Sequence, residues 1–205
     1  MIRPVVTNKV IDELKKLQKG TVLFVDDFLD FGNPESVKKA LFRMEEKGLL
    51  IRLAHGIYLH PKKDKDLGVL YPSAEEIAIA IAKRDRARII PTGVQALNKL
   101  GLSTQIPLKV VFLTDGAARS IKIGKRTITF KKTSPKNLLA KGEISGLAIQ
   151  ALKSIGQYKS DNYRIEDDVL TRLLTILKKE KKENILHDAK LAPAWINKIL
   201  MSATK

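Results

Sequence analysis

The stretch Leu50–Pro61, LIRLAHGIYLHP, constrains the fold more than any other part of the sequence. It alternates apolar and polar residues as a β-strand does, breaks before Gly56, and then alternates again. Gly56 allows the positive φ that a tight hairpin requires, and Pro61 cannot continue a strand ladder. The stretch therefore predicts a two-stranded ribbon in which Tyr58 packs inward. The two predicted strands are Leu49–Leu53 and Ile57–His60.

Three helical segments are predicted before this ribbon. Apolar residues recur at helical spacing over residues 6–17, and a short helix is predicted at Asp26–Phe31. Asn33 is a favourable N-cap and is followed by Pro, so a further helix is expected to begin there and to end at Gly48. This order of helix, short helix, turn, helix and ribbon is that of a winged helix-turn-helix, with the ribbon as the wing.

The rest of the chain mixes strand and helix patterns. Lys62–Gly68 is polar and is predicted to be a linker. Ser73 and Glu76 have the spacing of a capping box, and alternation on both sides of Gly124 predicts a hairpin whose Thr129 faces outward. Helices are expected at Glu143–Ile155, Asp167–Lys182 and Pro193–Met201.

The predicted fold class is therefore α+β. Residues 1–66 are expected to form a winged helix-turn-helix, and residues 69–205 a mixed α/β domain with a helical tail from about residue 143.

The charge of the chain predicts a polyanionic partner. Its 205 residues carry a formal net charge of +16, divided as +3 over residues 1–66, +8 over residues 67–133 and +5 over residues 134–205. The absence of Cys excludes disulfides and thiolate sites. No signal peptide or membrane span is recognisable, so a cytoplasmic protein without a membrane partner is expected.

The second helix of a helix-turn-helix pair offers its early side chains to the major groove, and the wing adds contacts to the backbone or minor groove. Lys and Arg bind phosphates or guanine, and Ser can serve either. The alternative is a winged helix that binds protein. The candidate DNA-binding residues are Ser36, Lys38, Lys39, Arg43, Arg52, His55, Lys62 and Lys63. A second basic surface is predicted at Lys122, Lys125, Arg126, Lys131 and Lys132.

No enzyme, metal or cofactor is expected. The three histidines do not have the spacing of a metal site, and Asp115 is not followed by the Glu-x-Lys pattern of a metal-dependent nuclease. The stretch PTGVQALNKLG lacks the Gly-Lys-Ser/Thr end of a phosphate loop. A nuclease with a degenerate site is the weakest reading of the chain.

The wing sequence GIYLHP resembles the Gly-x-Tyr-x-x-Pro wing of the AbiEi-type antitoxin and transcriptional regulator family. The stretches IIPTGVQALNKLGLSTQIPLKVVFLTDG and RSIKIGKRTITFKKTSP resemble the C-terminal domain of that family, in the same order. The resemblance covers about residues 5–155.

The resemblance implies an antitoxin that represses its own operon by binding inverted-repeat operator DNA through the winged helix, with two copies of the chain on each repeat. It also implies that the C-terminal domain counters a nucleotidyltransferase-like toxin without forming a stable complex with it. The alternative is an RNA-binding protein that protects a toxin's RNA target without reading DNA sequence.

Overall fold

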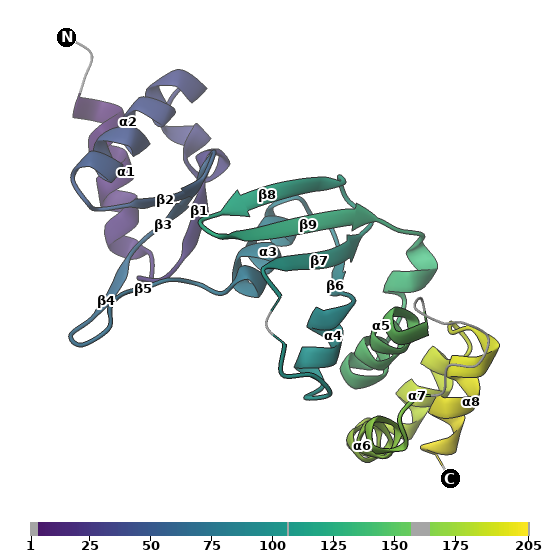
Figure 1. Cartoon of the computed structure of the whole chain (residues 1–205). Coiled ribbons are helices and arrows are strands. Elements are labelled where there is room, and N and C mark those ends of the chain that lie inside the picture. The colour runs from purple at the N-terminus through teal and green to yellow at the C-terminus, as the bar shows by residue number, and fades with distance from the viewer. Residues whose placement is uncertain (1–3, 106, 157–164, 205) are drawn as a thin grey trace. The chain divides into compact units, whose positions relative to one another are not determined.

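A computed structural model describes residues 4–105, 107–156 and 165–204 (Figure 1). The predicted α+β class is confirmed, because helices and several small sheets alternate along the chain. The chain divides into two compact units, one of Met1–Ala80 with Lys122–Gly124 and the other of Ile81–Ile121 with Lys125–Lys205. This division falls later in the sequence than the predicted boundary at residues 66–69.

Residues 4–59 of the first unit form three helical elements and a three-stranded sheet. The order of strands is β1-β3-β2, and β3 pairs antiparallel with both neighbours. The predicted two-stranded ribbon, formed by β2 and β3, therefore gains a third strand. The elements are α1 (Pro4–Lys16), β1 (Val22–Phe24), the 3-10 helix η1 (Val25–Phe31), α2 (Pro34–Glu46), β2 (Ile51–Ala54) and β3 (Ile57–Leu59).

Local signals in the sequence account for α2. The Asn33 side chain accepts a hydrogen bond from the backbone N–H of Ser36 at 2.8 Å, so the predicted N-cap is confirmed. One face of the helix is buried in the core of the first unit, where it meets Val10 and Leu14 of α1 and Phe28 of η1. The buried residues of α2 are Val37, Ala40, Leu41 and Met44.

The segment predicted to be a linker is instead a second hairpin, formed by β4 (Lys62–Asp64) and β5 (Gly68–Leu70). The Asp64 carboxylate accepts backbone hydrogen bonds from Asp66 and Leu67, at 2.9 and 3.1 Å, and so closes the turn. Gly68, directly after this turn, has a φ of +71°. A polar composition is compatible with an exposed ribbon as well as with a linker, which is why the prediction was wrong.

The helix α3 (Ala74–Arg84) follows, and its predicted capping box is confirmed. The Ser73 Oγ accepts from the Glu76 backbone N–H at 3.1 Å, and the Glu76 carboxylate accepts from the Ser73 N–H at 2.7 Å.

The strands β6 to β9 form a four-stranded sheet with the order β6-β7-β9-β8. The strand β7 is antiparallel to β6 and parallel to β9, and Phe112 pairs with Phe130 with their ring centroids 6.0 Å apart. Thr129 is buried and its hydroxyl lies 3.0 Å from that of Ser120, so the outward position predicted for it was wrong. The strand β9 lies between two others, which leaves less of it open to solvent. The strands are β6 (Ile89–Pro91), β7 (Lys109–Thr114), β8 (Arg119–Ile123) and β9 (Arg126–Lys132).

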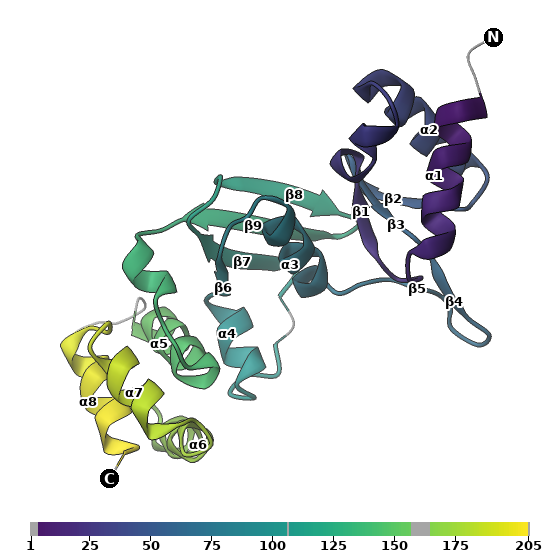
Figure 2. The ribbon, with the colours of Figure 1, turned by 180° about the vertical axis from the view of Figure 1, so that it is seen from behind.

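The C-terminal helices form a core rather than an appended tail. Leu152 of α5, Leu173 of α6, Ile185 of α7 and Ile196 of α8 belong to one buried cluster, which also includes Ala96 of α4. Both views of the ribbon show α6, α7 and α8 gathered beside α5 (Figure 2). The elements are α4 (Val94–Lys99), the 3-10 helix η2 (Pro135–Leu138), α5 (Glu143–Gly156), α6 (Asp167–Leu177), α7 (Lys182–Ala189) and α8 (Ala194–Ser202).

A buried carboxylate from α7 anchors the start of α5. Asp188 is fully buried and accepts hydrogen bonds from the backbone N–H groups of Lys141 and Gly142, at 2.8 and 2.9 Å. The Ser145 hydroxyl donates to it at 2.5 Å, and the His187 Nδ1 lies 2.8 Å from its other oxygen. Burial acts to raise the pKa of the Asp188 carboxyl, but these hydrogen bonds outweigh burial and hold the pKa below its ordinary value of 3.8.

A second carboxylate, that of Glu180, reaches the same helix end. It accepts from the backbone N–H of Ile144 at 3.0 Å, and negative charge is favourable at a helix N-terminus. The predicted single helix Asp167–Lys182 is therefore wrong: α6 ends at Leu177, and Glu180 lies in the connection to α7. The same packing leaves little room at Gly142, because a Cβ there would lie 2.5 Å from Glu180 Oε2 and closer still to Ser145 Oγ, so these hydrogen-bonding side chains would have to move.

We predict that Asp188→Ala lowers the free energy of unfolding by about 3 kcal/mol, because buried donors lose an ionised acceptor. Since the folded-state pKa of Asp188 is lowered, its contribution is complete above pH 3.8 and is lost as the pH falls through the folded-state pKa. Chemical denaturation from neutral to acidic pH measures both effects. Asp168→Ala, at a side chain 75% exposed, is the control and should change stability by less than about 0.5 kcal/mol. Equal losses in the two variants would contradict the anchoring role.

Candidate functional site

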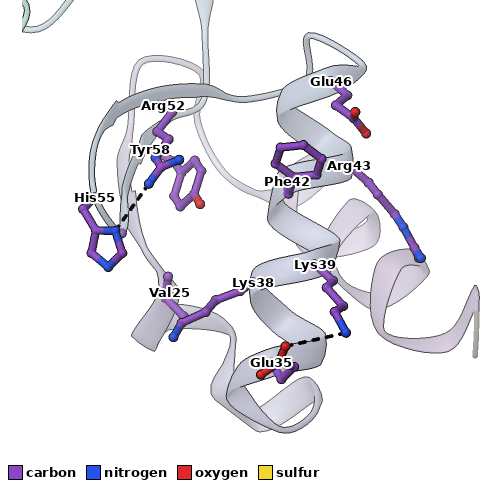
Figure 3. A pocket seen from close by; sticks show the side chains of 11 residues that line it. Val25, Glu35, Lys38, Lys39, Phe42, Arg43, Glu46, Arg52, His55 and Tyr58 are labelled. Atoms are coloured by element: carbon purple, nitrogen blue, oxygen red, sulfur yellow. Dashed lines mark hydrogen bonds and ion pairs between the residues drawn. The ribbon is translucent and has the colours of Figure 1, made fainter.

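A groove of about 400 Å³ lies between α2 and the β2–β3 ribbon, wholly within the first unit (Figure 3). We refer to it as the α2–ribbon groove. Its lining residues are Val25, Glu35, Lys38, Lys39, Phe42, Arg43, Glu46, Arg52, His55, Gly56 and Tyr58.

The helical repeat of α2 determines which of its side chains reach this groove. Burial of Val37, Leu41 and Met44 turns the opposite face outward, and Lys38 and Lys39 are therefore exposed at its first turns. Figure 3 shows Lys38 extending toward Val25 and the ribbon.

The ribbon supplies the other wall of the groove through Arg52, His55 and Tyr58. The register between β2 and β3 shifts between Arg52 and Ala54, which is a bulge beside the hairpin tip. Gly56 at the tip has a φ of +70°, the positive value that the sequence predicts. Tyr58 is 6% exposed, and burial raises the pKa of its phenol above the ordinary value of 10.0.

Arg52 and His55 are joined across the hairpin tip. The Arg52 guanidinium lies 3.3 Å from the His55 Nδ1, and both side chains are exposed. A guanidinium can only donate, so Nδ1 is the acceptor in this contact. The tip thus presents a guanidinium, a group suited to an anionic ligand, beside an imidazole ring.

The charges around the groove are predominantly positive. Four cations, Lys38, Lys39, Arg43 and Arg52, stand against the carboxylates of Glu35 and Glu46, a formal excess of +2. The Lys39 ammonium is 3.6 Å from the Glu35 carboxylate, with the two side chains 68% and 77% exposed. Pairs this exposed contribute little to stability, so Lys39 can exchange its partner for another anion at small cost.

Arg43 differs from the other cations in its direction. Figure 3 shows it pointing away from the ribbon, and its guanidinium donates to the Thr7 hydroxyl of α1 at 3.4 Å. Arg43 therefore lies at the edge of the groove rather than over its centre.

The structure brings together five of the eight residues predicted to bind DNA and separates three. Lys38, Lys39, Arg43, Arg52 and His55 line the α2–ribbon groove. Ser36 is partly buried at the start of α2, where its backbone N–H donates a hydrogen bond to the side chain of Asn33. Lys62 and Lys63 line a different groove of about 550 Å³, together with Pro61 and His60.

The five residues of the predicted second basic surface are all exposed, but they form two groups. Lys122, Lys125 and Arg126 surround the turn between β8 and β9, whereas Lys131 and Lys132 are at the far end of β9. Lys131 is five positions after Arg126 along β9, which places the groups about 17 Å apart. A single compact anion site is therefore not formed by these five side chains.

Two carboxylates of the second unit, those of Asp115 and Asp85, are bound by arginines. Asp115 accepts from the Arg88 backbone at 2.7 Å and from its guanidinium at 2.8 Å, and these bonds lower the pKa of Asp115. Asp85 is bound by Arg84 and Arg119. Within residues 4–105, 107–156 and 165–204, no group of three or more His, Asp or Glu side chains is arranged to hold a metal ion.

Phe42 is the residue of this groove that the sequence analysis missed as functional. Phe42 is 53% exposed, whereas the apolar residues of the core face of α2 are buried. The signal was present in the sequence, because Phe42 falls four residues after Lys38, on the polar side of the helical repeat.

Comparison with known proteins identifies a family. A family model described as "Family of unknown function (DUF6088)" matches residues 9–185. The RV2827C protein from Mycobacterium tuberculosis, known from a crystal structure, is similar with a TM-score of 0.49 and 12% identity, over 100% of this chain and 83% of that one. A search of curated proteins found no match. Among the helices of the described residues, none is long and apolar enough to cross a membrane.

We predict that Gly56→Val strains the ribbon tip and lowers the free energy of unfolding by about 1–3 kcal/mol, because a β-branched residue disfavours a φ of +70°. Space is not the cause, since the nearest atom to a Cβ there is Val25 Cγ2 at 3.8 Å. Gly56→Asn is the matched control, because Asn tolerates positive φ, and should retain most of the stability. Thermal unfolding of the two variants checks this, and a Val variant as stable as the Asn variant would refute it.

Proposed function

We propose that this chain, which belongs to the DUF6088 family, is a DNA-binding autorepressor with antitoxin activity. The observation that carries the DNA-binding part is the α2–ribbon groove, where cations of a helix and of a hairpin face one space. In this proposal, α1, η1, α2 and the sheet β1–β3 form a winged helix-turn-helix, with α2 as the recognition helix and the β2–β3 ribbon as the wing.

The dimensions of α2 suit this role. An α-helix with side chains is about 10–12 Å across, which matches the width of about 12 Å of the major groove of B-DNA. Lys38 and Lys39 are on the exposed face in the first half of the 13-residue helix, the part that meets base edges in a helix-turn-helix. Arg52 and His55 at the ribbon tip are then placed to meet the phosphate backbone.

The antitoxin part rests on the resemblance to the AbiEi-type family. By this resemblance, the C-terminal domain counters a nucleotidyltransferase-like toxin without a stable complex, and two copies of the chain occupy an inverted repeat. The exposed basic groups at the two ends of β9 are candidates for contacts with a polyanion in that role.

An RNA-binding protein that does not read DNA sequence is the competing reading. Positive charge alone does not distinguish the two polyanions. Binding of the full chain to a duplex from upstream of its own gene, compared with an unrelated duplex and tRNA, separates them. Preference for the upstream duplex supports the repressor, and preference for tRNA supports the alternative.

We predict that Lys38→Ala and Lys39→Ala each weaken binding to the upstream duplex. A lost phosphate contact lowers affinity evenly across sequences and reduces the slope of log K against log salt by about one, whereas a lost base contact costs about 1–3 kcal/mol and relaxes sequence preference. Titrations at several salt concentrations measure both quantities. The control is Lys15→Ala, at a lysine 71% exposed on α1 and outside the groove. If neither affinity nor slope changes at α2, then α2 is not at the DNA.

We predict further that repression and neutralisation can be separated. The double variant Lys38→Ala/Lys39→Ala should lose repression of a reporter fused to the upstream region, yet still restore growth of cells that express the toxin encoded beside it. The reason is that the proposal assigns neutralisation to the second unit. Loss of both activities in a variant that remains folded would show that the two roles share one surface.

A further inference from the structure

The exposed ring of Phe42 is unexplained by the fold. On α2 the apolar residues Val37, Ala40, Leu41 and Met44 are at most 1% exposed, whereas Phe42 is 53% exposed. Keeping an aromatic ring in water forgoes the hydrophobic free energy that its burial would give. Single exposed apolar side chains are common on protein surfaces, so exposure alone does not mark a site. Phe42 differs from the others in its place, because it lines the α2–ribbon groove together with Lys38, Lys39 and Arg52.

The surroundings of the ring specify what that ligand is like. Phe42 lies one turn after Lys38 and Lys39, and Figure 3 shows its ring farther along α2 than these two lysines, with Tyr58 and Arg52 on the ribbon side of the groove. A ligand that fills this groove meets the cations with anionic groups and the Phe42 ring with an apolar group.

We infer that Phe42 is a specificity-determining residue that contacts the C5-methyl group of a thymine in the major groove. This inference rests on the proposed function. A phenyl ring neither donates nor accepts conventional hydrogen bonds, so it cannot read the nitrogen and oxygen pattern of base edges. The apolar group that unmodified DNA displays in the major groove is the thymine methyl, and Phe is among the side chains that contact it.

Helix geometry limits where this thymine lies. Phe42 is four residues after Lys38, a rise of about 6 Å along α2. With a base-pair spacing of about 3.4 Å, the thymine falls within about two base pairs of the position that Lys38 contacts. The preferred sequence should therefore contain a T·A pair at a fixed short distance from the base or phosphate bound by Lys38.

The test uses the full chain and a duplex enriched by it from a pool of random synthetic duplexes. Each thymine of the enriched duplex is replaced in turn by deoxyuridine, which removes only the methyl group. At one or two positions the wild-type chain should lose about fourfold in affinity, the effect expected for one buried methyl-sized group. Phe42→Ala should bind the thymine and deoxyuridine duplexes equally at those positions, and Phe42→Leu should retain part of the difference.

Controls separate this contact from general damage. Tyr71→Ala removes an aromatic ring that is 63% exposed outside the α2–ribbon groove, and should leave the thymine preference intact. Thermal unfolding should show Phe42→Ala to be as stable as the wild type, since its ring contributes little to the core. Synthetic duplexes contain no 5-methylcytosine, the other base with a C5-methyl group. A loss of affinity on replacing thymine by deoxyuridine is therefore due to the thymine methyl.

Two results would overturn this inference but not the proposed function. One is a wild-type chain that tolerates deoxyuridine at every position, and the other is a Phe42→Ala variant that keeps the full preference for thymine over deoxyuridine. Either result would direct attention to an apolar protein partner for the ring. A wild-type chain that enriches no sequence from the pool would overturn the inference together with the proposed sequence-specific repressor.

Discussion

Burial of one face of α2 is the constraint on which the first unit depends. Val37, Leu41 and Met44 are fully buried against residues of α1 and η1, and a helix rotated by one residue would put Lys38, Phe42 and Glu45 in their places. The same constraint that closes the core therefore aims Lys38 and Phe42 outward, toward the space bounded by the ribbon. The rotation of α2 about its own axis therefore determines both which side chains stabilise the core and which ones face the groove.

Elements with strong local signals were predictable from the sequence. The N-cap at Asn33 and the capping box of Ser73 involve residues three apart, and such contacts form wherever the local chain is helical. Elements that depend on distant partners were not. The break after Leu177 accompanies a bond from Glu180 to the start of α5, 36 residues earlier, and burial of Thr129 follows from a central position in the sheet.

The candidate site was predictable to the extent that it follows helical phase and hairpin position. Lys38 and Lys39, together with Arg52 and His55, lie in one groove because the helix and the ribbon face each other. Lys62 and Lys63 lie elsewhere, because the chain turns into a new hairpin rather than continuing past the tip. Phe42 was overlooked because an apolar residue in an amphipathic helix is normally assigned to the core, and only its exposure reveals the difference.

The anchoring of α5 by Asp188 also affects the order in which the protein can fold as it is synthesised. The carboxylate binds backbone N–H groups that precede it by 46 and 47 residues, so the start of α5 lacks its anionic partner until residue 188 has left the ribosome. The core of the first unit, in contrast, draws on residues from Val6 to Tyr58 and is available much earlier. Domains generally fold N-terminal first during translation, so the α2–ribbon groove is expected to be complete on nascent chains whose second unit is still unfinished.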